Sequence, residues 1–432
     1  MKVKISDIFD FEKGALQSSK CVIGEYDFIT ASSDWKKHNV YTHECEALII
    51  AVAASGSLGR THYVNGKFIA SDLCFILQPK AEFKEKINLK FYYEYFNFIK
   101  DDLVFKTATG SAKKAINKLN FAQYEIIFPN KEYQDKIIQK LCEFKKDFGI
   151  LNENFEYDAK LVDKLRQSIL QDAIQGKLVP QNPNDEPALI LLEKIKAEKE
   201  QLIKEGKIKK EKFIINDEIP PYNIPSSWSW IRWNEILSYE KYSMKRGPFG
   251  SALRKDFFVS KGIRVFEQYN AINDDPYWAR YYITKEKYEE LKAFTANAGD
   301  LLISCSGVTL GRITEIPNDT DMGIINQALL KLNLNKKLIS NAYFKMLFKS
   351  KYMQDLIFEK ALGSAIPNMV GVVELKRIFI PLPPKEEQER IVARVNELMQ
   401  LCDKLENENN NAQKSSSELL QYLMQKYFTQ EV

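Results

Sequence analysis

Two stretches of the chain decide its organisation: Lys131-Glu132-Tyr133-Gln134-Asp135-Lys136-Ile137-Ile138 and Lys385-Glu386-Glu387-Gln388-Glu389-Arg390-Ile391-Val392. From Lys385 to the C-terminus, each position corresponds to one 254 residues earlier. Leu58-Gly59-Arg60 and Leu310-Gly311-Arg312 form a second matched pair. Further matched pairs are Val3–Ile8 with Ile231–Ile236 and Gly110–Ala112 with Gly363–Ala365. Collinear matches at a nearly constant offset indicate a tandem duplication, which predicts a function that needs two similar units.

Each of the two opening stretches begins a predicted long helix. Apolar residues from Ile137 to Ile169 follow alternating steps of four and three residues, interrupted at Asp158. This heptad stripe recurs in the second copy in the same register, with a more polar middle. Either each helix packs on its own domain, or the two helices pair with each other. Pairing is favoured because the lengths and seams correspond, and it would be antiparallel because the chain traverses a domain between the helices.

Short apolar runs separated by Gly and Asn turns precede each long helix. Ala47–Ala53 and Asp72–Leu77 are strand candidates in the first copy, and Asp300–Cys305 and Gln327–Leu332 in the second. We expect an α+β fold in which two similar strand-rich domains, produced by internal tandem duplication, are joined by two long antiparallel coiled-coil helices. The expected division is a first strand-rich domain (1–130), a first long spacer helix (131–178), a connecting loop, charged helix and linker (179–222), a second strand-rich domain (223–384) and a second long spacer helix (385–432).

The composition is that of a globular protein. The 432 residues are 45% hydrophobic and 28% charged, and a formal net charge of +4 permits a nucleic-acid partner without demanding one. The cysteines are scattered without a CxxC pair, and the three histidines all lie between His38 and His62, so neither a disulfide framework nor a zinc ribbon is indicated. No signal peptide opens the chain, and no apolar run approaches the ~18 to 20 residues needed to span a bilayer. We expect a cytoplasmic protein with no membrane partner.

Signatures of catalysis are missing from the sequence. None of its Gly-Lys pairs is followed by Ser or Thr, which excludes the usual P-loop, and no glycine-rich turn suggests a dinucleotide or S-adenosylmethionine site. Ile219-Pro220-Pro221-Tyr222 carries isoleucine where an amino-methyltransferase needs a polar residue, and we interpret it as a linker turn. We therefore predict no catalytic, cofactor-binding or metal-binding residues. A duplicated chain whose copies share no titratable cluster is better suited to binding than to catalysis.

The shared blocks do contain glycine turns that end in arginine. Ser55–Arg60 and Ser306–Arg312 place small residues and then an arginine after an apolar strand. Small residues let backbone N–H groups approach a phosphate, and arginine adds a forked donor. The alternative is a β-turn whose arginine pairs with a surface carboxylate. The loops Lys13–Lys20 and Lys245–Lys255 are also polar and basic, and they could reach DNA.

Several motifs together resemble one family. They are Trp228-Ser229-Trp230, Gly247-Pro248-Phe249-Gly250-Ser251, Leu310-Gly311-Arg312, Leu165–Leu178 and Pro381–Ile391. This set is similar to the specificity subunits of type I restriction-modification systems. The resemblance implies two target-recognition domains that each read one half of a bipartite asymmetric site on double-stranded DNA. It also implies that the paired helices act as a spacer and dock two methyltransferase subunits. Adenine methylation would belong to those subunits, and cleavage with translocation to separate restriction subunits.

The duplication adds a rule that limits where specificity resides. If the two domains read different half-sites, residues common to both position the backbone, a partner or the fold, and discriminating contacts lie in the unmatched loops. Arg60 and Arg312 are accordingly predicted as phosphate or structural residues. Base-reading residues are expected at Gln17–Lys20 and Trp35–His38 in the first copy, and at Arg254–Lys255 and Gln268–Asn270 in the second. The full predicted DNA-binding set is Lys13, Gln17, Ser18, Ser19, Lys20, Trp35, Lys36, Lys37, His38, Arg60, Lys113, Lys114, Lys245, Arg246, Ser251, Arg254, Lys255, Gln268, Asn270 and Arg312.

Two other functions remain open from the sequence. The heptads alone would permit a duplicated coiled-coil scaffold without a DNA-reading role, although large domains with basic loops are unusual for a scaffold. A fused enzyme that both binds and modifies DNA is the other possibility, and the missing methyltransferase signature argues against it.

Overall fold

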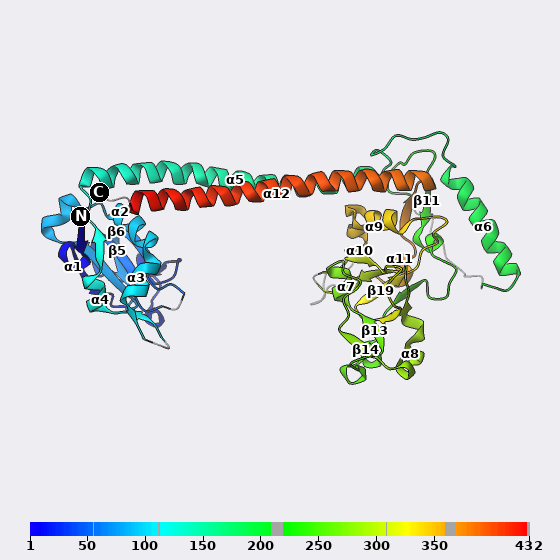
Figure 1. Cartoon of the computed structure of the whole chain (residues 1–432), viewed down its shortest axis with the longest axis horizontal. Helices are drawn as coiled ribbons and strands as arrows, with labels where there is room; N and C mark the ends of the chain where they lie inside the picture. Colours follow the sequence, from blue (N-terminus) through cyan, green and yellow to red (C-terminus); the bar gives the residue numbers. More distant parts are fainter. Residues whose placement is uncertain (55, 111–112, 209–218, 308, 359–367, 430–432) are drawn as a thin grey trace. The chain divides into compact units, whose positions relative to one another are not determined.

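The computed structural model describes the chain except residues 55, 111–112, 209–218, 308, 359–367 and 430–432 (Figure 1). The matched tripeptides at 110–112 and 363–365 therefore lie mostly outside the described residues. The chain forms two compact units: unit 1 comprises Met1–Tyr157 and Glu408–Val432, and unit 2 comprises Asp158–Asn407. Each unit contains one strand-rich region and one end of each long helix.

Unit 1 is built on a six-stranded sheet with the order β2-β7-β5-β6-β3-β4. All its pairs are antiparallel except β3 with β6. The strands and helices of this region are β1 (Lys2–Lys4), α1 (Ile5–Ile8), β2 (Phe9–Lys13), β3 (Tyr26–Ile29), β4 (Lys36–His38), β5 (His43–Ala51), β6 (Thr61–Ala70), β7 (Cys74–Pro79), α2 (Leu89–Phe98), α3 (Lys100–Thr107), β8 (Ala108–Thr109), β9 (Ala115–Ile116), α4 (Lys118–Gln123) and β10 (Glu125–Ile127). Aromatic residues of α2 cover the sheet, because Phe91, Tyr92 and Phe96 are fully buried.

Unit 2 repeats this arrangement in two pieces. One four-stranded sheet has the order β12-β19-β16-β17, which matches β2-β7-β5-β6, and a separate sheet has the order β14-β13-β18-β15. The elements are α6 (Ala188–Lys204), β11 (Ser229–Arg232), β12 (Met244–Arg246), β13 (Ile263–Phe266), α7 (Gln268–Ile272), β14 (Tyr281–Ile283), α8 (Lys285–Leu291), β15 (Thr295–Ala296), β16 (Leu301–Ser304), β17 (Ile313–Glu315), β18 (Gly323–Ile325), β19 (Leu329–Leu332), α9 (Asn341–Lys349), α10 (Lys351–Phe358), α11 (Val372–Leu375) and β20 (Phe379–Leu382). The strands that have no counterpart in the other unit therefore differ in placement. In unit 1, β3 and β4 extend the common sheet, whereas in unit 2 β14, β13, β18 and β15 form a separate sheet.

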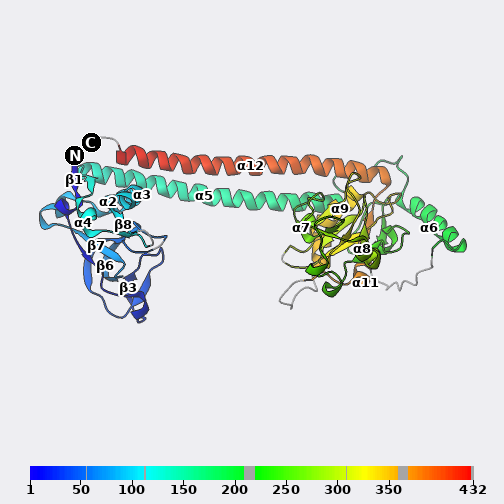
Figure 2. The same cartoon turned by 60° about the horizontal axis from the view of Figure 1, so that its bottom comes forward.

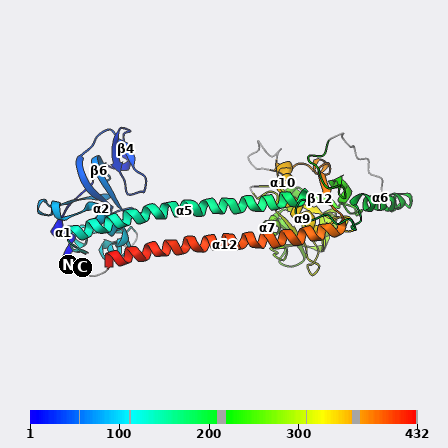
Figure 3. The same cartoon turned by 90° about the horizontal axis from the view of Figure 1, so that it is seen from above.

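The long helices are α5 (Lys131–Ile174) and α12 (Lys385–Thr429). In unit 1, the Tyr133 hydroxyl donates to the Tyr427 carbonyl at 3.1 Å, so the start of α5 lies against the end of α12. In unit 2, Arg166 donates to Asp403 and Glu406 at 2.5 and 2.8 Å. Late α5 therefore lies beside early α12, and the helices are antiparallel in both units (Figures 1 and 3). The expected α+β class, with tandem units and paired long helices, is confirmed.

A matched glutamine explains why the repeated stretch decides the fold. Gln134 and Gln388 have no exposed surface. The Gln134 side chain donates to the Lys86 and Pro129 carbonyls at 2.9 and 2.8 Å and accepts from the backbone N–H of Asn88 at 2.7 Å. Gln388 makes the equivalent bonds to the Leu338 and Pro383 carbonyls and to the Ser340 N–H. Because Asn88 and Ser340 cap α2 and α9, each glutamine fixes a long helix to its own aromatic helix.

The connecting helix α6 lies in the segment predicted to contain a charged helix, and part of it is buried. Ala188, Leu192 and Ile195 belong to the core of unit 2. Further along, Glu198 forms an ion pair with Lys337 at 2.7 Å. The helix is therefore anchored from Ala188 to Glu198, and its C-terminal end extends beyond the strands (Figure 2).

Candidate nucleic-acid interface

The glycine turn that precedes each matched arginine has the same geometry in both units. Gly59 and Gly311 both have φ of 79°, a conformation that favours glycine. The Gly59 N–H donates to the Ala51 carbonyl at 2.8 Å, and the Gly311 N–H donates to Ser304 at 2.9 Å. The shared Leu-Gly-Arg sequence therefore builds one common turn at the end of β5 and β16.

The two arginines that leave this turn behave differently. Arg60 is half-buried, and its guanidinium donates to the Ala31 carbonyl at 3.4 Å and to the Ser57 hydroxyl at 3.3 Å. Arg312 is exposed. Among the residues that the structure describes, no carboxylate pairs with Arg312. Arg60 thus supports its own domain, and Arg312 is free to contact a partner.

A second shared feature fixes the base of each basic loop. Gly14 and Gly247 follow β2 and β12, and their N–H groups each donate at 2.9 Å, to Cys74 and Leu329 respectively. A Cβ at Gly14 would lie 2.2 Å from the Ser71 carbonyl oxygen, and one at Gly247 would lie 1.8 Å from that of Asn326. No side chain fits at either position. Each basic loop therefore leaves its sheet at an equivalent, tightly packed glycine.

Most of the candidates in unit 1 lie on its surface. Trp35 is 38% exposed, and its indole N–H donates to Nδ1 of the buried His62 at 3.3 Å. Burial, and then the charge of Arg60, lowers the pKa of His62. Lys37 forms an ion pair with Asp27 at 2.7 Å. The remaining exposed candidates are Lys13, Gln17, Ser18, Ser19, Lys20, Lys36, Lys113 and Lys114.

His38, which was predicted to contact DNA, is buried in the structure. Its side chain is 6% exposed, and Nδ1 accepts the backbone N–H of Val22 at 3.0 Å. It therefore holds the loop before β3 against β4. The same loop presents Val22 and Ile23, which are 55% and 91% exposed and were not selected from the sequence. An apolar pair in a loop has no periodicity that could single it out.

In unit 2, the basic loop after β12 is exposed at Ser251, Arg254 and Lys255. Phe249 at its tip is 89% exposed, although sequence analysis treated it only as part of a motif. Lys245 and Arg246 lie at the root of the loop and are half-buried. Lys245 lies over the rings of Tyr242 and Phe294, and Arg246 donates to the Asn368 side chain at 2.9 Å. Both side chains therefore contact unit 2 itself and stabilise the root of the loop.

Gln268 and Asn270 also differ from the expectation that they read bases. Asn270 has no exposed surface, and its amide donates to the Asp275 and Trp278 carbonyls at 2.9 and 2.7 Å. The Gln268 amide donates to the Ser304 hydroxyl at 2.7 Å and to the Ser306 carbonyl. These side chains hold α7 and the following loop in place. Asn270 is fully buried, whereas Gln268 is half-buried with its N–H groups bonded within the unit.

The described residues contain neither a metal-binding cluster nor a membrane-spanning helix. No group of three or more His, Cys, Asp or Glu side chains there could hold a metal ion. No helix in the described part of the chain is long and apolar enough to cross a membrane.

Comparison with protein families decides the classification. The family described as "Type I restriction modification DNA specificity domain" matches residues 1–155 and 267–413. The chain belongs to this family. The two matched stretches include both copies of the repeated turn and long-helix start, as the sequence resemblance predicted.

Individual relatives agree with the family. The chain is 30% identical over 276 residues to the type I restriction enzyme EcoAI specificity subunit of Escherichia coli, a match that covers 62% of this chain and 45% of the relative. The EcoDI specificity subunit of Escherichia coli is 22% identical over 437 residues, with 100% of this chain and 88% of the relative covered. The chain spans less than half the length of the EcoAI and EcoEI subunits in their matches.

Solved structures share the fold at low identity. A chain solved in work on complex assembly and conformational transition of the type I R-M system has a TM-score of 0.67 at 15% identity, with 100% of this chain and 98% of the other covered. The HsdS subunit from Thermoanaerobacter tengcongensis gives a TM-score of 0.54 at 16% identity, with 100% and 97% covered. At this identity the comparisons establish the fold.

Proposed function

We propose that this chain is the DNA sequence-specificity subunit of a type I restriction-modification complex. Each strand-rich domain recognises one half of a bipartite asymmetric site on double-stranded DNA. The chain directs adenine methylation by two methyltransferase subunits and restriction by separate subunits, and it performs neither reaction itself. The observation that carries the proposal is the family match over both copies of the duplicated unit.

The division between shared and unshared residues supports two readers of different sequences. Gly14 and Gly247 perform the same structural task, as do Gln134 and Gln388. The exposed side chains around these common positions differ in size and charge between the units. Contacts common to both copies cannot distinguish two half-sites, whereas unmatched exposed residues can.

Two exposed sets are the best candidates for base contacts. In unit 1 they are Gln17–Lys20 and Lys36, and in unit 2 they are Ser251, Arg254 and Lys255. Amide and guanidinium groups can form bidentate bonds with purine edges in the major groove, and each such pair discriminates by about 1–3 kcal/mol. Lys113 and Lys114 are further exposed cations among the predicted DNA-binding residues of unit 1.

The direct test is mapping of methylated adenines in host DNA with and without this gene, with the partner methyltransferase expressed. Loss of methylation at one split, asymmetric motif would support the proposal and give both half-sites. An unchanged methylation pattern would contradict it. The scaffold alternative is not favoured, because the family match includes the strand-rich domains as well as the helices.

A further inference from the structure

Unit 2 contains an open groove of about 940 Å³ that the proposed base-reading loops do not form. Its walls come from the end of α5, the start of α12, the exposed side of α9 and the Leu310–Arg312 turn. Arg312, Lys345 and Lys349 all line it. Only Arg312 of these three cations was selected from the sequence, because the lysines belong to a helix whose apolar face dominates its pattern.

Both carboxylates that line the groove have hydrogen-bond partners, whereas two of its cations have no ion-pair partner among the described residues. Asp274 accepts from the Thr314 hydroxyl at 2.6 Å and lies 3.8 Å from Lys345. Glu315 accepts from the Asn341 amide at 2.8 Å. Within the described chain, neither Arg312 nor Lys349 has an ion-pair partner. Besides Arg166, which pairs with Asp403 and Glu406, the groove lining therefore carries three basic side chains against two carboxylates.

The lysine at the end of α9 is poised for an anion. Burial lowers the pKa of Lys349; Asp274 opposes this shift, while Lys345 and Arg312 add to it. A bound anion would offset the repulsion among the three cations and raise the pKa of Lys349 again. The arrangement therefore favours a ligand with negative charge.

Most of the apolar side chains that line the groove are already buried, although Ile272, Val392 and Met399 are half-buried. Leu170, Leu310, Met346 and Val395 line the groove but are only 4–7% exposed, because they belong to the core of unit 2. Covering side chains that are already buried removes little further apolar surface from water. A partner helix with an apolar face would gain less here than a ligand that uses the cations.

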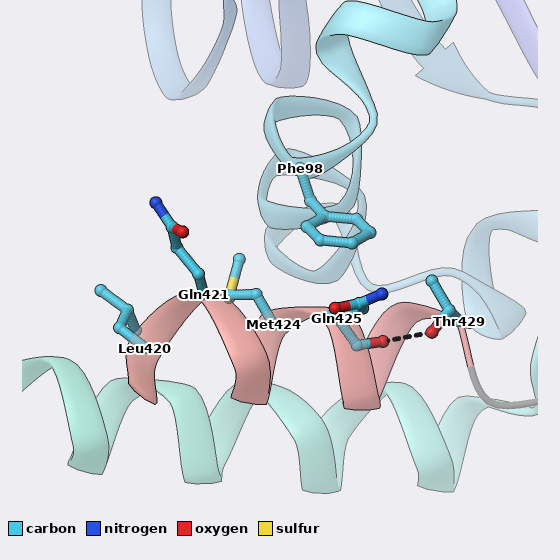
Figure 4. A pocket seen from close by; sticks show the side chains of 6 residues that line it. All are labelled: Phe98, Leu420, Gln421, Met424, Gln425 and Thr429. Carbon is cyan, nitrogen blue, oxygen red and sulfur yellow. Dashed lines mark hydrogen bonds between the residues drawn. The ribbon is translucent and has the colours of Figure 1, made fainter. Parts of the chain in front are cut away.

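The corresponding corner of unit 1 has different chemistry. There the end of α12 and α2 form a smaller pocket lined by Phe98, Leu420 and Met424 (Figure 4). A second pocket, on α2 and the start of α5, includes Lys90 and Glu94, and Glu94 pairs with Lys145. Counted from the matched helix caps Asn88 and Ser340, Tyr93 and Asn97 stand where unit 2 has Lys345 and Lys349. The two lysines of the cationic cluster are therefore a property of unit 2 and not of the common framework.

We propose that the groove of unit 2 binds backbone phosphates of the DNA through Arg312, Lys345 and Lys349, and that unit 1 has no equivalent contact. This inference rests on the proposed DNA-reading function and adds an asymmetry to it. The three side chains strengthen binding to any sequence and do not select bases, because phosphates carry no sequence information directly.

The test measures DNA affinity against salt for the complex of this chain with its methyltransferase subunits, using a duplex that carries the mapped site and a scrambled duplex. The triple variant Arg312→Gln, Lys345→Gln and Lys349→Gln should flatten the slope of log K against log salt by about 3, since each lost phosphate contact removes about one unit. The ratio of affinities for the mapped and scrambled duplexes should stay as in the wild type.

Lys351→Gln provides the matched control. Lys351 lies on the adjacent α10 in an ion pair with Asp355, outside the groove lining, so the salt slope should not change. A triple variant with the wild-type slope would overturn the groove assignment while site-selective binding by the wild type upheld the proposed function. A triple variant that lost methyltransferase subunits but kept the slope would assign the groove to an acidic protein segment instead. A wild-type complex without any preference for the mapped duplex would overturn the proposed function itself.

Discussion

At the scale of single residues, the duplication separates structural from variable positions. Buried polar residues such as Gln134 and Gln388 repeat because each bonds backbone groups that join a long helix to its aromatic helix. Arg60 and Arg312 show that a repeated residue need not repeat its role. Sequence comparison finds the repeated arginine, but its partner is set by residues far along the chain, such as Ala31.

Gln388→Leu should destabilise unit 2, because it leaves the Leu338 carbonyl and the Ser340 N–H buried without this partner. An unsatisfied buried group costs about 1–3 kcal/mol, so the urea midpoint of the full chain should fall clearly. Gln413→Leu, at an exposed position on α12, is the control and should leave the midpoint nearly unchanged. Equal midpoints for the two variants would show that the buried glutamine is dispensable.

His62 should make unit 1 sensitive to acid. Its pKa is lowered by burial, so below the ordinary value of 6.5 the unfolded chain binds a proton that the folded chain resists. The stability that neutral His62 contributes is present above that pH and is lost as the pH falls below it. Between pH 8 and pH 5.5, the urea midpoint of the wild type should therefore fall further than that of His62→Asn. Identical falls in both proteins would exclude this role for His62.

At the scale of elements, the helices and strands with periodic apolar residues are the most predictable from the sequence. The heptad stripes predicted both long helices and their antiparallel pairing, and the apolar runs coincide with β5, β7, β16 and β19. The aromatic-rich segment from Asn341 to Phe358 forms two helices, since α9 ends at Lys349 and the buried Ser350 separates it from α10.

The exposure of loop residues could not be predicted in the same way. His38 and Asn270 look like surface polar residues in the sequence, but both are buried. His38 bonds to Val22, and Asn270 bonds to Asp275 and Trp278. Such bonds depend on how a loop folds back on itself, which has no periodic signature. Lys349 was missed for a related reason, because its groove forms only when α9 meets the Leu310–Arg312 turn.

Phe249 provides a test of the basic loop after β12. Phe249→Ala should change the free energy of unfolding, measured by urea denaturation, by less than about 0.5 kcal/mol. The ring is 89% exposed and has few contacts to lose. It should weaken binding to the mapped duplex, because exposed apolar rings can contact thymine methyl groups or wedge between base steps. Val373→Ala, at another exposed apolar position of unit 2, should affect neither quantity. Unchanged DNA affinity of Phe249→Ala would remove this loop tip from the interface.

At the scale of the whole molecule, two similar units carry different exposed loops on a common framework, and two antiparallel helices connect them. The family match, the repeated buried glutamines and the repeated glycine turns all agree with the proposal of two separate DNA-recognition domains. Under the proposed function, the cationic groove of unit 2 would give the two domains different contacts with the DNA backbone.

The most direct test of the two-reader account exchanges residues 1–130 for the corresponding domain of a relative with a different known site, followed by mapping of methylated adenines. The new motif should carry one changed half-site and one half-site identical to that of the wild type. A motif changed in both halves would contradict the account that each domain reads its own half of the site.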